Sequence, residues 1–310
     1  MSYYVEPRLR RDFGGIITAY FKFLKVNMAG IFRSFIAYNG IFVILFIITS
    51  YMMVIGFTEV FANGVVDGYA QNPDEVATMI AGFGIILFII IFLIATLINY
   101  GLSSSYVSIY EIEKRNNLPR KQVWSKTTSK LGGLFLMALV AVVLYVIYFI
   151  IQLMLAFIPI LGSIVTLVIG FAFNAWISMA VFSYVHNNHL NIFQALEETM
   201  TLLFSNIWRA IGVNFVLGLL IQLGLYALSI VPAIVSGVVI FHTVQENGGI
   251  VGDVTSQILL VILLTLLCVL AMFSQALSQT VNAFLYFNLH ESKYNTYLHT
   301  RISKLGETAV

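Results

Sequence analysis

Charged residues are scarce in this 310-residue sequence: Asp, Glu, Lys and Arg make up 10% of it, whereas 60% of the residues are hydrophobic. A soluble globular domain has about 25% charged residues, which cover its surface in water. The composition therefore excludes a soluble domain, and it also excludes a disordered chain, which needs high charge and low hydrophobicity. A mean hydropathy of +0.93 predicts an integral membrane protein instead.

Cysteine is nearly absent, with Cys268 as the single example. One thiol excludes a scaffold held by internal disulfides, and in an apolar stretch it is best interpreted as a small packed side chain. No secretory leader is apparent, because the first long apolar run starts near Ile36, behind a basic segment too long for a leader. We therefore expect the first span to stay in the membrane as an anchor.

Long apolar runs are what the sequence does contain. A helix needs about 20 apolar residues to cross a bilayer, and six stretches are long enough. They are 36–57, 80–104, 133–158, 162–185, 210–237 and 256–287. We expect an all-α membrane bundle that forms one transmembrane domain over 1–310, with a basic segment at 1–35, the spans within 36–287 and a tail at 288–310.

The basic residues are distributed unevenly along the chain. All 16 Lys and Arg residues lie before span one, between spans two and three, between spans four and five, or in the tail. The connections 58–79 and 242–255 contain none, although they contain several acidic residues. Because loops rich in Lys and Arg stay in the cytoplasm, both termini are predicted to be cytoplasmic.

Three of the basic-side segments have amphipathic patterns, at 13–28, 119–131 and 192–207. The last is the clearest, and Asn191 followed by Gln194 predicts a capping box at its start. We interpret the three as helices lying on the membrane surface, and the alternative is that they form docking surfaces for a partner protein. Because each precedes two spans, the chain is predicted to contain three parallel units, 13–113, 119–189 and 190–291.

Short motifs around the fourth span resemble those of a known group. They are Asn174-Ala175-Trp176-Ile177-Ser178, Phe193-Gln194-Ala195-Leu196-Glu197-Glu198-Thr199 and Asn206-Ile207-Trp208-Arg209. With these motifs the chain resembles bacterial six-span families typified by the YciC-like proteins and by the membrane domain attached to some glycerophosphodiester phosphodiesterases. The opening over 11–27 resembles that of uncharacterised membrane proteins of the Bacteroidetes. The resemblance implies a multi-pass protein of the bacterial cytoplasmic membrane, and it implies no phosphodiesterase activity, because the catalytic domain is not in this sequence.

The predicted spans contain no Asp, Glu, Lys, Arg or His. Ionisable groups at membrane depth are typical of proton relays and ion-coupled transport, so their absence argues against a pump or a driven transporter. His186 and His189 are three residues apart but have no acidic or cysteine partner at ligand spacing, so we expect no metal site. Without a catalytic constellation, a cofactor motif or the stacking aromatics of a nucleic-acid module, we expect neither an enzyme, nor a cofactor, nor a nucleic-acid partner.

The polar residues inside the spans are neutral, and span six contains the largest group of them. The candidate set comprises one residue of span four and five that share a face of span six: Asn174, Ser274, Gln275, Ser278, Gln279 and Asn282. One interpretation is hydrogen bonding between helices, where each bond contributes roughly 0.6 kcal/mol. The other is a polar cleft for a neutral solute or a lipid headgroup.

These observations predict a non-enzymatic membrane component, either an accessory subunit or a lipid-interacting scaffold. Its expected partners are membrane lipids and a protein bound through the amphipathic helices. The alternative function is a facilitator that moves a neutral or lipid-like molecule through the polar cleft.

Overall fold

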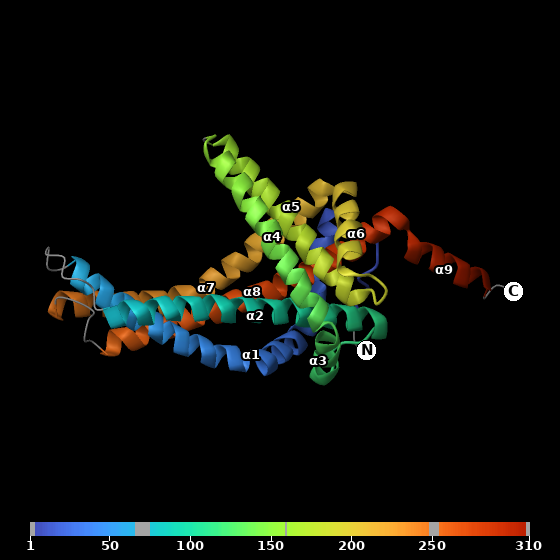
Figure 1. The fold of residues 1–310 in the computed structure, drawn as a ribbon. Coiled ribbons are helices and arrows are strands. Elements are labelled where there is room, and N and C mark those ends of the chain that lie inside the picture. The colour runs from blue at the N-terminus through green and yellow to red at the C-terminus, as the bar shows by residue number, and fades with distance from the viewer. Residues whose placement is uncertain (1–3, 66–74, 159, 248–253, 308–310) are drawn as a thin grey trace. The chain divides into compact units, whose positions relative to one another are not determined.

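The computed structural model describes residues 4–65, 75–158, 160–247 and 254–307, and within these ranges every regular element is a helix (Figure 1). The expected all-α fold is confirmed. The helices are α1 (Phe13–Val65), α2 (Glu75–Glu113), α3 (Arg120–Ser129), α4 (Leu131–Ala156), α5 (Leu161–His186), α6 (Ile192–Ser205), α7 (Ile207–Asn247), α8 (Val254–Tyr294) and α9 (Thr296–Glu307).

Six of these helices, α1, α2, α4, α5, α7 and α8, are long and apolar enough to cross a membrane. The shortest, α4 and α5, have 26 residues each, more than the about 20 residues that a bilayer core requires. Each predicted span lies within one of these six helices, with one exception. The span predicted at 133–158 extends two residues beyond the end of α4 at Ala156. The structure therefore supports a multi-pass membrane protein.

Some helix boundaries differ from the sequence-based expectation. The segment 13–28 is not a separate helix, because α1 continues through it and through the first span. No proline occurs between 28 and 36, so nothing there breaks the backbone hydrogen-bonding pattern. Gly30 in that stretch lies against the hydroxyl of Tyr106 on α2, where a larger side chain would clash. The amphipathic pattern at 119–131 corresponds to α3, which is shorter and has Pro119 as its N-cap.

The chain packs into two compact units. We name Met1–Phe35, Leu97–Ile221 and Gln275–Val310 the basic unit, because every Lys and Arg of the sequence falls in it. Ile36–Thr96 and Gln222–Ser274 form the second, cation-free unit. Each unit combines segments distant in the sequence, and the borders between the units fall within α1, α2, α7 and α8. A single transmembrane domain over 1–310, built from three tandem pairs of spans, stays a prediction.

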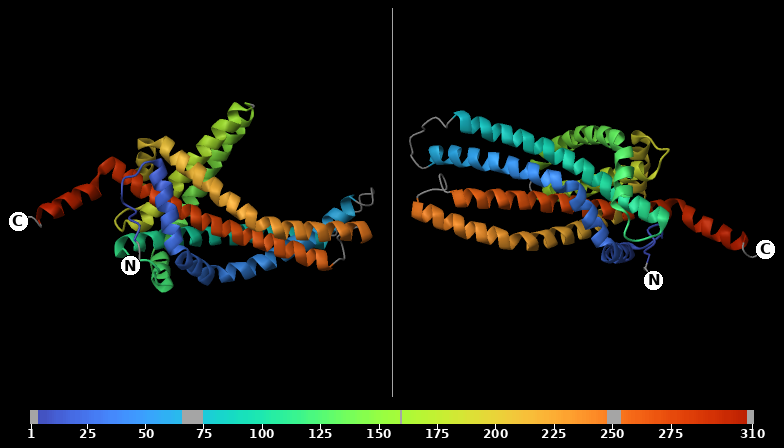
Figure 2. Two further views of the ribbon diagram at one scale, coloured as in Figure 1. Left: turned by 180° about the vertical axis from the view of Figure 1, so that it is seen from behind. Right: turned by 90° about the horizontal axis from the view of Figure 1, so that it is seen from below.

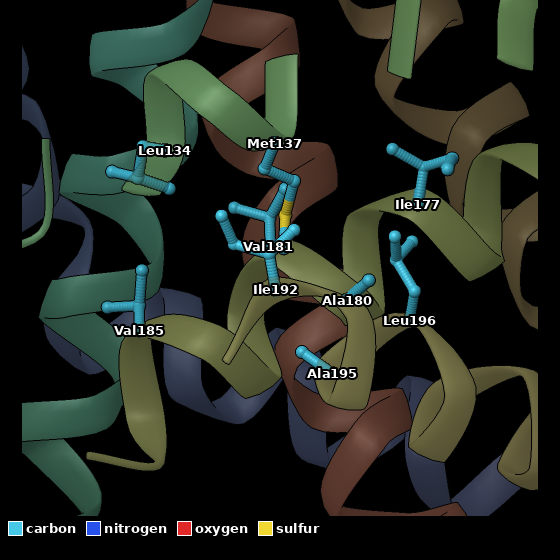
Figure 3. Packing of buried hydrophobic residues seen from close by; sticks show 9 residues of the cluster. All are labelled: Leu134, Met137, Ile177, Ala180, Val181, Val185, Ile192, Ala195 and Leu196. Carbon is cyan, nitrogen blue, oxygen red and sulfur yellow. The ribbon is translucent and has the colours of Figure 1, made fainter. Parts of the chain in front are cut away.

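The core of the basic unit forms where α4, α5 and α6 meet (Figure 3). Trp176 fixes the position of α6 by donating its indole N–H to the Leu196 carbonyl oxygen, 2.9 Å away. Both bonds of the predicted capping box are present between Asn191 and Gln194, each 2.9 Å long. The buried cluster consists of Leu134, Met137, Ile177, Ala180, Val181, Val185, Ile192, Ala195 and Leu196.

The cation-free unit contains parts of α1, α2, α7 and α8, which run alongside one another (Figure 2). Phe46 of α1 packs against Phe88 of α2, with ring centroids 5.5 Å apart. Gly56 of α1 lies directly against Ala81 of α2, and a larger residue at 56 would force these helices apart. Small residues at such a crossing allow the close backbone approach that stabilises helix pairs in lipid.

Candidate functional site

The amides of the predicted polar cleft act as hydrogen-bond donors between and within helices. Gln279 of α8 is fully buried and donates to Ser104 Oγ on α2 at 2.8 Å and to the Ser178 carbonyl oxygen on α5 at 2.9 Å. Asn282, also buried, donates to the Ser278 carbonyl oxygen within α8 at 3.1 Å. Gln279 therefore ties three helices together, as the interhelical interpretation requires.

The remaining members of that set are less connected. Ser274 and Ser278 are half-buried and lie one turn apart on the same face of α8. Asn174 on α5 is half-buried and interacts with the hydroxyl of Tyr145 on α4. The side-chain oxygens of Gln275, Gln279 and Asn282 have no hydrogen-bond partner among the residues that the structure describes.

A second polar region surrounds residues 4–12, which precede α1 and which we name the N-terminal strap. Tyr110 of α2 bonds Val5 twice, accepting from its N–H at 2.8 Å and donating to its carbonyl oxygen at 3.0 Å. Asn288 of α8 donates to the carbonyl oxygens of Leu9 and Arg11, at 3.4 and 3.1 Å. The strap is thus fastened to the ends of two long helices.

Arg8 is the most connected side chain of the strap. Its Nε lies 2.8 Å from Glu111 Oε1, and a terminal nitrogen lies 3.0 Å from His186 Nε2. Its guanidinium also sits 5.4 Å from the centroid of the Phe287 ring. Arginine only donates, so His186 Nε2 is the acceptor and its proton is on Nδ1, which lies 2.8 Å from Ser108 Oγ. The strap, α2, α5 and α8 therefore meet around one cation.

Ser108 connects this network to α3. Lys126 Nζ lies 2.6 Å from Ser108 Oγ, and burial lowers the pKa of the Lys126 ammonium to about 8, with Lys130 acting in the same direction. Ser108 Oγ therefore accepts from both the imidazole N–H and the Lys126 amine, and neither group is placed to take its proton as an activated nucleophile requires. Ser108 is also 0% exposed, so no substrate reaches its oxygen in this conformation.

Sequence reasoning missed this network. It treated Arg8 and Lys126 only as markers of topology, and it did not consider Ser108 or Glu111. One signal was available: Ser104, Ser108 and Glu111 are spaced by four and three residues, so they share a face of α2. Polar side chains along one face of an apolar helix, followed by a carboxylate near its end, require hydrogen-bond or ion-pair partners when they are buried.

The acidic residues of α6 and α8 hold the neighbouring helix ends. Glu198 of α6 accepts from Ser183 Oγ at 2.5 Å and from the Tyr286 hydroxyl at 3.0 Å. Glu291 of α8 is buried, and its carboxylate accepts the N–H groups of Tyr297 and Leu298 at 2.9 and 3.0 Å. Glu291 therefore caps the first turn of α9.

Two hollows flank the strap. The larger, about 470 Å³, is an open groove between the strap and the first turns of α1, and we name it the strap groove. It falls in the size range of small-molecule sites, about 300–1,000 Å³. Its lining residues are Tyr4, Val5, Glu6, Leu9, Arg11, Gly15, Thr18, Ala19 and Lys22. The smaller hollow, about 70 Å³, is lined by Arg8, His186, Asn187, Tyr286, Phe287, His290 and Glu291.

The charged side chains of the strap groove have different surroundings. The Arg11 guanidinium donates to the carbonyl oxygens of Glu6, Pro7 and Leu9. The Glu6 carboxylate is held by the Tyr297 hydroxyl and by Arg301, which lies 3.3 Å away. Lys22 is exposed. The groove therefore has an exposed cation, Lys22, beside apolar walls.

Metal binding by the paired histidines has no support in the described part of the chain. No group of three His, Cys, Asp or Glu side chains there comes close enough to hold an ion. The two ring nitrogens of His186 already contact Arg8 and Ser108, so neither is open to a metal ion in this conformation.

Comparison of the chain with protein-family models, curated proteins and solved structures finds no match. The resemblance to the YciC-like families therefore stays a prediction.

Proposed function

We propose that the protein is a non-enzymatic component of a bacterial cytoplasmic membrane, with both termini in the cytoplasm, and that it acts as a lipid-interacting scaffold or accessory subunit. The separation of charge supports this orientation. Every Lys and Arg falls in the basic unit, and the cation-free unit contains the two connections that lack them.

The strap groove is the observation that carries the lipid interaction. The exposed Lys22 supplies positive charge, while Val5, Leu9 and Ala19 supply apolar contact. An acidic phospholipid combines these properties, because its phosphate pairs with cations and its acyl chains pack on apolar side chains. Each Lys or Arg near an anionic lipid surface contributes about 1 kcal/mol of binding free energy.

Exposed aromatic residues support a scaffolding role. Phe193 and Phe204 of α6 and Trp208 of α7 are exposed, although the opposite side of α6 is buried in the core. The amphipathic segment 192–207 is therefore divided: part of its apolar face packs inside the protein, and part is free to contact lipid or a partner helix. Large exposed apolar side chains in such a position are typical of interaction surfaces.

Native mass spectrometry in a mild detergent tests the proposal. We expect retained phosphatidylglycerol in preference to phosphatidylcholine, and a several-fold loss of that adduct in Lys22→Gln. Lys25→Gln is the matched control, because Lys25 is exposed on the same helix but does not line the groove. A stoichiometric protein partner supports an accessory subunit, whereas substrate turnover by the purified protein contradicts a non-enzymatic role.

One observation favours the second candidate, a facilitator of a neutral or lipid-like molecule. The buried oxygens of Gln275, Gln279 and Asn282 lack partners among the described residues, and a passing hydroxyl group could donate to them. The facilitator predicts that glycerol leaks from proteoliposomes and that Gln279→Leu abolishes the leak. The scaffold predicts no leak in either protein.

A further inference from the structure

Helix α9 is a defined C-terminal element with a fixed start. It begins at Thr296, and one residue, Asn295, separates it from the end of α8 at Tyr294 and makes the turn with a positive φ of 50°. Glu291 of α8 accepts the N–H groups of Tyr297 and Leu298 in the first turn, and the Glu6 carboxylate binds Tyr297 and Arg301. Beyond this attachment α9 extends away from the rest of the basic unit (Figures 1 and 2).

One face of α9 is apolar and exposed. Leu298 and Ile302 are four residues apart and therefore lie on the same side of the helix, 54% and 57% exposed. The Arg301 side chain beside them is 56% exposed. The opposite side carries Thr300 and Ser303. This combination of apolar, cationic and polar sides is typical of helices that lie in the membrane interface.

The position of α9 in the chain decides what covers this face. The apolar run of α8 ends near Phe287, and α9 starts nine residues later. At about 1.5 Å of rise per helical residue, that distance is roughly 14 Å, so α9 stays near the end of a membrane-spanning segment. Lys293 is exposed close to this junction, and its ammonium complements a negatively charged surface.

We propose that α9 docks on an acidic lipid surface, with Leu298 and Ile302 inserted at the boundary between headgroups and acyl chains. Glu6 holds Tyr297 and one edge of the helix toward the strap, which leaves Leu298 and Ile302 to face the lipid. The inference uses α9 and its attachment alone, so it does not rest on the strap groove or on the proposed function.

Fluorescence of the full-length protein in lipid nanodiscs tests this docking. A Cys268→Ala background removes the native thiol, and an environment-sensitive dye is attached through Ile302→Cys or, as the matched control, Thr300→Cys. With phosphatidylglycerol present, we expect the dye at 302 to shift to shorter wavelength and to be quenched by spin-labelled lipid. The dye at 300 is expected to stay accessible to iodide.

Three results overturn the proposal. Equal iodide quenching at 302 and 300 places the apolar face in water. Shielding at 302 without quenching by spin-labelled lipid shows that a second copy or another protein covers the face. An identical response in phosphatidylcholine alone shows that an acidic surface is not required. A Lys293→Gln change gives a second measure that leaves the Glu6–Arg301 pair intact, because docking through charge predicts a several-fold higher fraction of undocked helix.

Discussion

At the scale of single residues, Lys126 is the group with the clearest pH dependence. Burial lowers its pKa to about 8 in the folded protein, whereas an unfolded Lys titrates near its ordinary value of 10.5. Between these values the unfolded chain binds more protons, so the free energy of unfolding increases as the pH rises from about 8 to 10. The ammonium is part-exposed, so the gain is on the order of 1 kcal/mol.

We therefore expect the melting temperature of the wild type to rise relative to that of Lys126→Met across this pH range. Thermal unfolding in detergent at several pH values measures the difference. Lys121→Met is the control, because Lys121 is exposed on the same helix. If the melting temperatures of the wild type and of Lys126→Met change in parallel with pH, Lys126 does not titrate between about pH 8 and 10.

The pair of Arg8 and Glu111 gives a second test at this scale. Removing Arg8 leaves a mostly buried carboxylate without its cation and leaves His186 Nε2 without its donor. Breaking a buried ion pair costs about 3–5 kcal/mol, and the side chain of Arg8 is 35% exposed, so we expect roughly 1–3 kcal/mol for Arg8→Met. Glu111→Gln should cost less, because the amide oxygen still accepts from Arg8.

Chemical denaturation of both variants measures the order of these effects. Arg10→Met serves as the control, because Arg10 is exposed in the same strap. If Arg8→Met is no less stable than Arg10→Met, the strap is not held by this ion pair.

At the scale of elements, local sequence patterns predicted helix α6 well, but they did not predict the contacts between residues distant in the sequence. The six spans and the capping box of Asn191 and Gln194 follow from hydrophobicity and from the spacing of a few residues, and both are present. The continuity of α1 could not be inferred from amphipathicity, because a change from a surface pattern to a buried pattern does not itself break a helix. The pairing of Arg8 with Glu111 joins residues 103 positions apart, so no local pattern indicates it.

The capping box makes a prediction for α6. In Asn191→Ala the N–H of Gln194 loses its side-chain acceptor, and such a loss typically costs about 1 kcal/mol. Hydrogen exchange should increase in the first turn of α6 and stay unchanged in α5. Thr201→Ala is the control on the same helix, since Thr201 is exposed and bonds only the carbonyl oxygen of Glu197 among described residues. Equal exchange in the two variants would mean that core packing alone holds the start of α6.

At the scale of the whole molecule, charge and packing divide the chain at the same places. The borders of the basic unit fall at Phe35, Leu97, Ile221 and Gln275, and no Lys or Arg lies on the other side of any of them. This agreement relates topology to stability. The types of residue that orient a membrane protein during insertion here also hold its fold together: Arg8 pairs with Glu111, and Lys126 bonds the Ser108 hydroxyl.

The orientation itself can be measured with two engineered thiols in the Cys268→Ala background. Lys25→Cys marks the basic unit, and Val76→Cys marks the start of α2 in the cation-free unit, where Val76 is 60% exposed. A maleimide that cannot cross membranes should label position 76 in intact spheroplasts and position 25 only after lysis, because Lys and Arg residues are retained on the cytoplasmic side. Labelling of position 25 before lysis would mean that the topology is the reverse of the proposed one. The strap groove and α9 would then lie on the outer surface, and the outer leaflet would have to supply the acidic lipids proposed for them.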